Sequence, residues 1–377
     1  MHISPEKQQF CKMKISFLNL ALLGILSTIQ ILSINPSHSQ EFPFPTIDIT
    51  NPRLLQAYIA LQAWKLAIVS DPKGFTTNWV GPDVCSYTGV FCAPAPDDSK
   101  VITVAGIDLN HADIAGFLPK ELGLLKDLAL FHLNSNQFYG TIPDSFSHLR
   151  LLFELDLSNN LFSGTFPLVV LALPSLKFLD IRYNKFYGHI PPELFDLKLD
   201  ALFINNNKFM SLLPENLGNS PVSVFVAASN FITGCIPRSV ARMGHTLEEI
   251  ILSNLELTGC FVPELGQAKE LRVLDVSFNE LKGPLPDSLG MLKNLEQLNV
   301  AHNKLSGHIP TSICTLPRLE NFIYSFNYFS SESPVCLRLP GHDDRENCIP
   351  GRPLQRSSEE CRMFYALAIN CEAIPCL

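Results

Sequence analysis

The chain has 377 residues, of which 46% are apolar and 17% are charged, and its formal net charge at pH 7 is −8. This composition is typical of a folded protein and excludes a disordered one, while the acidic balance argues against nucleic acid as a partner. Eleven cysteines in a chain of this size favour an oxidising compartment.

The N-terminal region reads as a targeting segment. Three lysines precede an apolar run over residues 15–34, and the small residues Ser37 and Ser39 offer a cleavage site, so residues 1–39 are predicted to be a signal peptide. An uncleaved signal anchor is the alternative, because the run is long. Cleavage would leave 25 basic and 35 acidic residues, a formal charge of −10. No second run of spanning length follows, so we expect a secreted mature chain without a transmembrane segment.

A pattern of Leu, Asn, Gly and Pro positions returns about every 24 residues, and each copy is called a rung below. The Asn position is marked by Asn136, Asn160, Asn184, Asn207, Asn230, Asn279, Asn303 and Asn327. A further rung has Leu255 at this position, and Ala112 marks a weaker first one. About ten rungs predict an α/β fold, a leucine-rich-repeat solenoid over residues 101–331 with parallel strands on its concave face.

The repeated residue types have separate physical roles. The Leu, Ile, Val and Phe positions are predicted to stack into one apolar core, which includes the Phe column. That column contains Phe138, Phe162, Phe186, Phe209 and Phe329. The Asn amides are predicted to satisfy backbone groups where each strand turns. Leu255 and Ala112 cannot do this, so their rungs are expected to be less regular.

Both ends of the solenoid are predicted to carry caps. In residues 40–100, a helix over Arg53–Val69 is followed by Cys85 and Cys92, whose spacing indicates a small disulfide. Residues 332–377 form a Cys-rich cap in which a short helix over residues 357–369 is expected to close the other end.

The remaining cysteines leave most pairings open. Cys235 and Cys260 occupy the same phase in adjacent rungs, and neighbouring rungs lie roughly 4.8 Å apart, so we predict that they pair. The other six are Cys314, Cys336, Cys348, Cys361, Cys371 and Cys376. Six cysteines allow 15 pairings, and one could instead bridge to a second chain in a homodimer. The spacings match no zinc site, so neither a metal nor a cofactor is expected.

Several segments carry a resemblance to a known family. The repeat, the N-terminal cap and the Cys spacing resemble plant-type extracellular leucine-rich-repeat proteins. A narrower similarity rests on NPRLLQAYIALQAWKLAI, TGVFCAPAPDD, GCIPRSV, ELTGCFVPELG and PVCLRLPGHDDRENCIPGRPLQRS. These segments are similar to the head of leucine-rich repeat extensins, cell-wall proteins of land plants, from about residue 48 onward. The hydroxyproline-rich extensin module of that family has no counterpart here, which implies a soluble or loosely held head.

The predicted concave face is the main clue to function. Its central positions are Asp108, His132, Asp156, Asp180, Phe203, Val226, Ile251, Asp275, Asn299 and Ile323, flanked by Asn134, Glu154, Phe178, Arg182, Tyr183 and Phe278. The N-terminal half therefore reads as an acidic strip with aromatic neighbours, and the middle as exposed apolar residues suited to a buried contact. The alternative is that Asp is merely typical of such strands.

These features favour binding over catalysis. The sequence contains no GxSxG, HExxH, P-loop or GxGxxG motif, so no enzyme is expected. An acidic, aromatic face suits a small basic Cys-rich peptide. The resemblance implies peptides of the rapid alkalinisation factor type, a link to cell-wall integrity and a location in the cell wall. Wall polysaccharide or a receptor-kinase ectodomain are further partners to consider. The alternatives are an inhibitor of a secreted wall hydrolase, like the polygalacturonase-inhibiting proteins, and a structural wall protein.

Overall fold

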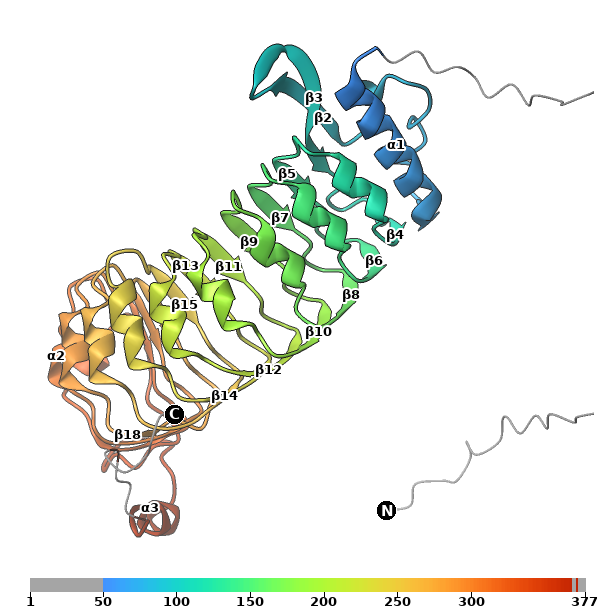
Figure 1. Cartoon of the computed structure of the whole chain (residues 1–377). Coiled ribbons are helices and arrows are strands. Elements are labelled where there is room, and N and C mark those ends of the chain that lie inside the picture. Colours follow the sequence, from blue (N-terminus) through green and yellow to red (C-terminus); the bar gives the residue numbers. More distant parts are fainter. Residues whose placement is uncertain (1–49, 368–370, 372–377) are drawn as a thin grey trace, which may run out of the picture. The chain divides into compact units, whose positions relative to one another are not determined.

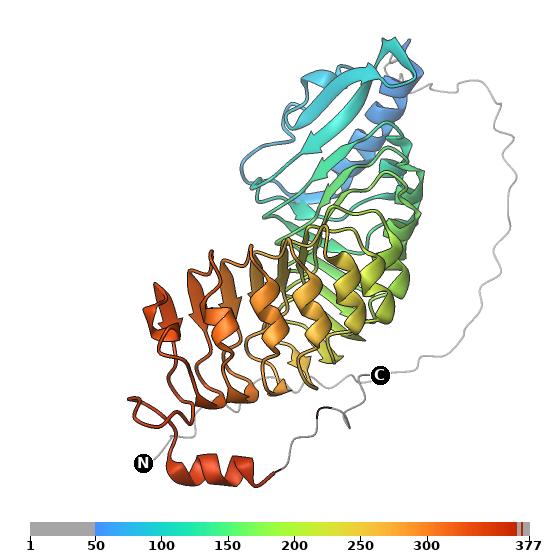
Figure 2. The ribbon, with the colours of Figure 1, turned by 90° about the vertical axis from the view of Figure 1, so that its left-hand side faces the viewer.

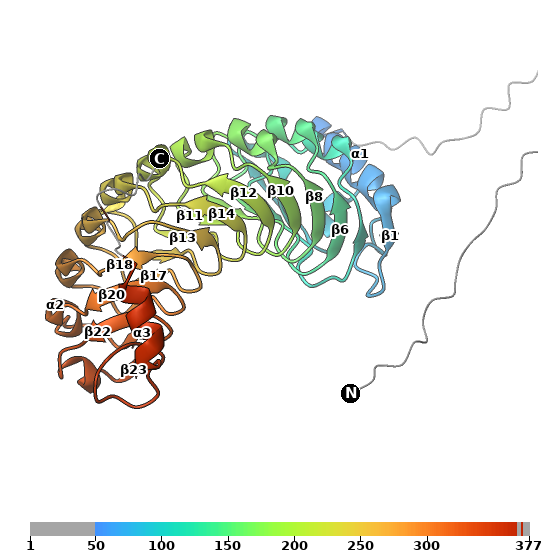
Figure 3. The ribbon, with the colours of Figure 1, turned by 90° about the horizontal axis from the view of Figure 1, so that it is seen from below.

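A computed structural model describes residues 50–367 and residue 371. The predicted signal peptide and Cys376 lie outside the described residues, as does the end of the helix expected at 357–369. Residues 50–367 form an arc of stacked rungs, with helical turns along the outer side and strands along the inner side (Figures 1 and 3). The predicted α/β repeat solenoid is confirmed.

One long sheet, the concave sheet, runs through all rungs. Its strands are β2 (Val90–Ala95), β3 (Asp98–Asp108), β5 (Leu130–His132), β7 (Glu154–Asp156), β9 (Phe178–Asp180), β11 (Ala201–Phe203), β13 (Val224–Val226), β15 (Glu249–Ile251), β17 (Val273–Asp275), β19 (Gln297–Asn299), β21 (Asn321–Ile323) and β23 (Gly341–Asp343). From β3 onward every pairing is parallel. β23 lies beyond residue 331, so the strand ladder continues into the Cys-rich segment.

The return limbs of the rungs form two lateral sheets. One contains β1 (Ile68–Ser70), β4 (Ala115–Gly116), β6 (Gln137–Gly140), β8 (Leu161–Gly164), β10 (Lys185–Gly188), β12 (Lys208–Leu212), β14 (Phe231–Gly234) and β16 (Glu256–Leu257). The other contains β18 (Lys282–Gly283), β20 (Lys304–His308) and β22 (Tyr328–Ser331). The pairing of β1 with β4 is antiparallel, and it joins the N-terminal cap to the first rung.

Short helical turns complete the rungs on the outer side of the arc (Figure 2). They are the 3-10 helices Lys120–Leu124, Asp144–His148, Leu168–Ala172, Pro192–Asp196, Glu215–Asn219, Arg238–Met243, Pro263–Gln267 and Asp287–Met291, followed by α2 (Thr311–Cys314). Two further 3-10 helices, Val84–Ser86 and Cys336–Arg338, lie in the caps. Most of these turns follow a proline in extended conformation at the N-cap position, and Pro192 and Pro263 occupy the first helical position, which the fixed φ of proline favours.

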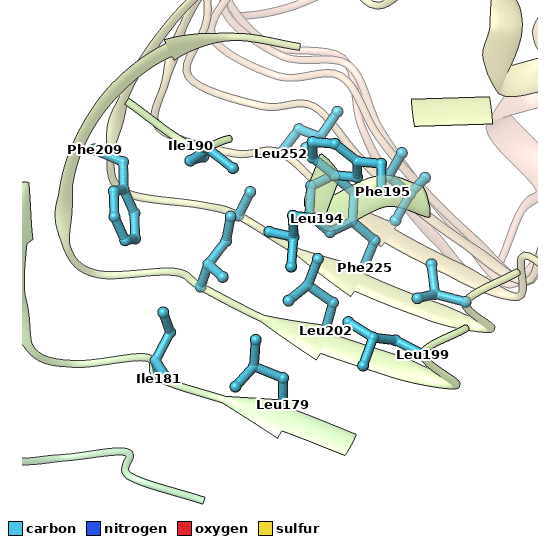
Figure 4. Packing of buried hydrophobic residues seen from close by; sticks show 14 of the residues in the cluster. Leu179, Ile181, Ile190, Leu194, Phe195, Leu199, Leu202, Phe209, Phe225 and Leu252 are labelled. Carbon is cyan, nitrogen blue, oxygen red and sulfur yellow. The ribbon is translucent and has the colours of Figure 1, made fainter. Parts of the chain in front are cut away.

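The core is a stack of apolar side chains that repeats from rung to rung (Figure 4). The predicted Phe column is confirmed: Phe138, Phe162, Phe186 and Phe209 are buried, and successive rings stack with centroids 6.3–6.5 Å apart. Phe329 is also buried. At about 25 cal/mol per Å² of buried apolar surface, this continuous stack is the main source of stability.

The Asn column satisfies buried backbone groups, as predicted. In Asn160, Nδ2 donates to Leu133 O at 2.8 Å and to Leu157 O at 3.2 Å, while Oδ1 accepts from Phe138 N at 2.9 Å. Asn347 adds one more step to this ladder in the Cys-rich segment. Leu255 interrupts the ladder, because its side chain can neither donate nor accept a hydrogen bond.

The N-terminal cap agrees with the sequence. Helix α1 (Pro52–Ala67) begins after Asn51, whose side chain accepts from Arg53 N, and it ends two residues before the predicted boundary. The Cys85–Cys92 disulfide is confirmed. Trp64 of α1 is fully buried against Trp79 of the cap, with ring centroids 5.7 Å apart. The cap thereby covers the first rung with large aromatic surfaces.

The predicted Cys235–Cys260 disulfide is wrong. Cys260 pairs with Cys371, while Cys235 is engaged in a different disulfide. Residues of equal phase are not opposite each other in the lateral sheets: Gly234 lies opposite Leu257, so Cys260 is two residues beyond the partner position of Cys235. Two residues along a strand and one strand across amount to roughly 8 Å, which exceeds the Cα separation that a disulfide spans.

The other C-terminal cysteines form Cys314–Cys336 and Cys348–Cys361. Helix α3 (Ser358–Tyr365) starts at a capping box of Ser357 and Glu360, and its position agrees with the start of the helix predicted over residues 357–369. It does not close the end of the solenoid, however, because Phe364 stacks on Tyr328 of β22 at 3.7 Å and holds the helix against the lateral side. The last rung is instead followed by the segment with β23, where Cys336 and Ile349 are buried.

Candidate functional site

All residues of the predicted binding face lie on or directly beside the concave sheet. The central column contains Asp108, His132, Asp156, Asp180, Phe203, Val226, Ile251, Asp275, Asn299 and Ile323. Each residue lies directly opposite the next, and Glu154 lies opposite Phe178 in the adjoining column. Neighbouring strands are roughly 4.8 Å apart, so these residues are neighbours on one face of the sheet. Asp343 of β23 continues the central column.

The N-terminal part of the central column carries accessible charge. Asp108 is exposed, and His132 Nε2 lies 3.0 Å from Glu154 Oε2. Asp156 is half-buried, and its Oδ1 accepts from Ser158 N at 2.9 Å and from Ser158 Oγ at 2.5 Å. These bonds engage one oxygen of Asp156, which leaves its second oxygen available to a ligand.

Asp180 is not the exposed acid that the sequence suggests. Its side chain is 1% exposed, and Arg182 Nε lies 3.0 Å from its Oδ2. Burial, and secondarily the charge of Asp156, raise the pKa of Asp180 to about 7, against the opposing effect of Arg182. Below that pH the Asp180 carboxyl is mainly neutral. At mildly acidic pH the acidic strip therefore carries less charge than its sequence implies.

Arg182 also reaches over the aromatic residues beside Asp180. Its guanidinium carbon lies 4.9 Å from the centroid of the Phe203 ring, and Phe203 contacts Phe178 with ring centroids 5.6 Å apart. The arginine thus covers both a carboxyl and a ring face, two groups that a cationic ligand would use. The remaining N–H groups of Arg182 are suited to donate to a carboxylate of a ligand.

The apolar middle of the column is less exposed than predicted. Val226 is buried at 9% exposure, and Phe203 and Ile251 are half-buried. The reason is the in-phase register, which places apolar neighbours side by side on adjacent strands so that they shield one another. The region still offers a continuous apolar strip between Asp180 and Asp275.

Three aromatic rings at the C-terminal end of the concave face form a stack that the sequence did not predict. His302 lies between Phe278 and Phe326, with each pair of rings 4.1 Å apart and tilted by 11°. Burial lowers the pKa of His302. All three residues have positive φ, at the turn that follows the concave strand. Their equal spacing of 24 residues was the signal in the sequence that could have revealed the stack.

Charged groups elsewhere form structural networks. In the N-terminal cap, Arg53 lies 2.6 Å from Asp97 and 2.9 Å from Asp127. At the far end, Arg345 forms two hydrogen bonds with Asp343 and lowers the pKa of Asp343 to about 2. Among residues 50–367 and 371, no three His, Cys, Asp or Glu side chains gather as a metal site would require. The helices of this part are also too short or too polar to cross a membrane.

The fold has clear counterparts among solved structures. The Arabidopsis receptor kinase HAESA, solved with the peptide hormone IDA and the co-receptor SERK1, aligns with a TM-score of 0.68 and 28% identity over 78% of this chain and 50% of that one. A plant ice-binding protein aligns with a TM-score of 0.66 and 26% identity over 81% of this chain and 98% of that one. Two such different roles on one architecture show that the fold alone does not determine function.

Family models and curated relatives are more specific. The leucine rich repeat N-terminal domain matches residues 56–93, and the Leucine Rich Repeat model matches 175–197, 270–292 and 294–316. Leucine-rich repeat extensin-like protein 6 of Arabidopsis thaliana is 70% identical over 344 residues, 91% of this chain and 73% of that protein. Protein 3 of the same series is 62% identical over 94% of this chain, but only 48% of its own length is covered. The chain belongs to the family of leucine-rich repeat extensin-like proteins.

Proposed function

We propose that this chain is an extracellular recognition module of the plant cell wall that binds a small basic secreted peptide on its concave sheet. The observation that carries the proposal is the central column, in which Asp108 and Asp156 precede a continuous apolar strip that Asp275 closes. A cationic peptide with apolar side chains would find complementary groups along it. The HAESA structure supports this proposal, because a related repeat ectodomain is named there as binding a peptide hormone.

The finer proposal is a Cys-rich peptide of the rapid alkalinisation factor type, with a role in wall integrity and growth. It rests on the family to which the chain belongs. A receptor-kinase ectodomain is a reasonable second partner, since the HAESA complex also contains a co-receptor. Four disulfides among the described residues support an oxidising, extracellular location.

Titration calorimetry at about pH 5.5 against a panel of basic secreted peptides tests the proposal. Asp156→Lys with Asp275→Lys is the informative variant, because both carboxyls are accessible, whereas a lysine at buried Asp180 would disturb folding. We expect at least a tenfold loss of affinity. The matched control is Glu193→Lys with Glu215→Lys, which makes the same charge change at two exposed positions on the outer side of the arc.

Two results would contradict the proposal. If Asp156→Lys with Asp275→Lys weakens binding no more than Glu193→Lys with Glu215→Lys does, the effect is one of bulk charge and the concave sheet is not the site. If no peptide binds but the protein inhibits a secreted polygalacturonase, the alternative of a hydrolase inhibitor replaces this one.

A further inference from the structure

Part of the larger lateral sheet exposes a group of apolar side chains. Strands β10, β12 and β14 lie side by side along one edge of the arc (Figure 1). On them Tyr187, Met210, Leu212 and Phe231 are 50%, 54%, 52% and 50% exposed, and Met210 lies directly opposite Phe231. Single exposed apolar residues are normal, but a contiguous group of them marks an interaction site.

The exposed side chains surround a groove, here called the lateral groove. Its volume is about 670 Å³, and its apolar lining includes Ile190, Met210, Leu212 and Phe231. This volume leaves room for more than one large apolar side chain of a partner. Met210 adds a flexible and polarisable wall that can adapt to the shape of such a side chain.

The charge near the lateral groove is opposite to that of the chain as a whole. The chain has a formal charge of −8, yet the return limbs over residues 137–143, 159–167, 183–192, 206–214 and 229–237 contain no Asp or Glu. Lys185 and Lys208 are exposed there, and neither has an ion-pair partner among the described residues. Glu256 also lines the groove, but it lies on β16, at the end away from both lysines. A partner that docks here is therefore favoured when it is acidic.

The two lysines and the apolar side chains belong to one face of the sheet. Alternate residues of a strand point to the same side, so Lys208, Met210 and Leu212 of β12 share one face. Lys185 and Tyr187 of β10 do the same, and Tyr187 lies directly opposite Lys208. The lateral groove thus combines an apolar floor with a positively charged edge.

We propose that the lateral groove is a docking site for a partner protein that presents an acidic segment with large apolar side chains. The apolar side chains enter the groove, and the carboxylates pair with Lys185 and Lys208. This preference is opposite to that of the concave sheet, where Asp156 and Asp275 favour a basic ligand. The two faces can therefore hold two partners of opposite charge, and the lateral site does not depend on what the concave sheet binds.

Two other occupants fit the lateral groove less well. A second copy docked through the same surface would bring its Lys185 and Lys208 towards those of the first copy, and like charges repel across such a contact. A polysaccharide would bury hydroxyl groups against Ile190 and Leu212, which cannot form hydrogen bonds with them, and buried unpaired hydroxyls are costly. An acidic polypeptide segment avoids both penalties.

A peptide-display selection tests the chemistry of the partner. A library of random peptides is first depleted on the variant Lys185→Glu with Lys208→Glu, whose concave sheet is unchanged, and is then selected on the mature parent protein at low ionic strength. The depletion removes peptides that bind elsewhere. We expect the selected peptides to combine Asp or Glu with Leu, Ile, Met or Phe. Selected peptides without carboxylates, or no selected peptide at all, would overturn the proposal.

Titration calorimetry with the most enriched peptide then tests where it binds. Lys185→Glu with Lys208→Glu should weaken binding about tenfold or more, and so should Met210→Ser with Leu212→Ser. All four side chains are exposed, so we expect the fold to persist, and an unchanged thermal unfolding midpoint checks this. If Met210→Ser with Leu212→Ser binds as the parent does, the groove is not the contact.

The matched control is Lys120→Glu with Lys126→Glu, which makes the same charge change at two exposed positions outside the lateral groove. It should bind the enriched peptide like the parent, and an equal loss would reduce the effect to bulk charge. Asp156→Lys with Asp275→Lys should also leave this affinity no weaker, so that failure of the lateral site and failure of the concave site are told apart.

Two glycan probes, cellohexaose and an oligogalacturonide, test the competing class of occupant. We expect no heat of binding that depends on the lateral groove. Binding of either probe that Met210→Ser with Leu212→Ser abolishes would assign the groove to a polysaccharide and overturn the proposal.

Discussion

The concave and lateral sheets are built from the same rungs, yet their strands pair in different registers. In the concave sheet, residues of equal phase are opposite each other, as Asp156 and Asp180 are. In the lateral sheets the pairing is shifted by two residues, so that Tyr139 lies opposite Leu161 and not opposite Ser163. The repeat phase therefore identifies neighbours on the concave face and misidentifies them on the lateral side. This explains why the residues of the predicted face are neighbours on the concave sheet, whereas Cys235 and Cys260 are not paired.

The largest expected effect concerns the Asn column that joins the two kinds of sheet. Asn160→Ala should lower the free energy of unfolding by about 4 kcal/mol, because Phe138 N is left without a partner in a buried site and three carbonyls each lose one of their two hydrogen bonds. Urea unfolding measures it. The control is Gln137→Ala, an exposed position on the lateral sheet. A similar cost in both variants would refute the role given to the ladder.

A second variant compares helix α3, which is held by a disulfide, with the rungs of the solenoid, which support one another by stacking. Replacing Cys348 and Cys361 by Ser should cost about 3 kcal/mol by the loop-entropy estimate. Helix α3 has no buried residue, so its amides should lose protection first, while those of β7 and β9 keep theirs. Hydrogen exchange distinguishes these regions. Earlier opening of β7 would mean that α3 stabilises the whole solenoid.

The pH dependence of stability tests the buried acid on the concave face. The pKa of Asp180 is about 7 in the folded chain, above its ordinary 3.8, so its folded form binds the proton more tightly. Its contribution is fully present below about pH 4 and is lost as pH rises towards 7. Asp180→Asn cannot ionise, so between pH 4.5 and pH 8 it should lose about 3 kcal/mol less stability than the parent.

Denaturant midpoints across that pH range measure this difference. Asp156→Asn is the comparison, because it removes the neighbouring charge but leaves Asp180 able to ionise. Its effect on the pH profile should be smaller than that of Asp180→Asn. Parallel profiles of Asp180→Asn and the parent would show that Asp180 titrates in its ordinary range.

The smallest effect belongs to an ion pair across the concave strands. Arg272 Nε donates to Glu296 Oε1 at 3.1 Å, but the arginine is half exposed, so Arg272→Ala should cost less than about 1 kcal/mol. The cost should vanish at high salt, which leaves the hydrogen-bonded register intact. If Arg272→Ala lowered the free energy of unfolding more than Asn160→Ala does, surface ion pairs would matter more for stability than the buried Asn amides, which contradicts this ranking.

The repeat pattern predicted the solenoid and the Phe and Asn columns, and local spacing in the N-terminal cap predicted helix α1 and the Cys85–Cys92 pair. Each of these follows from local sequence or from strict periodicity, because a residue type recurring at one phase must recur in one place of the rung. The composition of the central column was predicted for the same reason. The burial of Asp180 was not, because it depends on Arg182 and Phe203, which come from the same and the next rung.

Only the tertiary structure determined the contacts that the position of a residue within the repeat does not specify. The two-residue shift of the lateral sheets follows from how the return limbs cross the stack, and it separated Cys235 from Cys260. Folding also brings Cys371 into a disulfide with Cys260, which lies 111 residues earlier in the sequence. Periodicity determines which residues share a column, since each rung is built alike. The contacts between columns, and the path of the non-repeating end, depend on distances that exist only after the rungs have stacked.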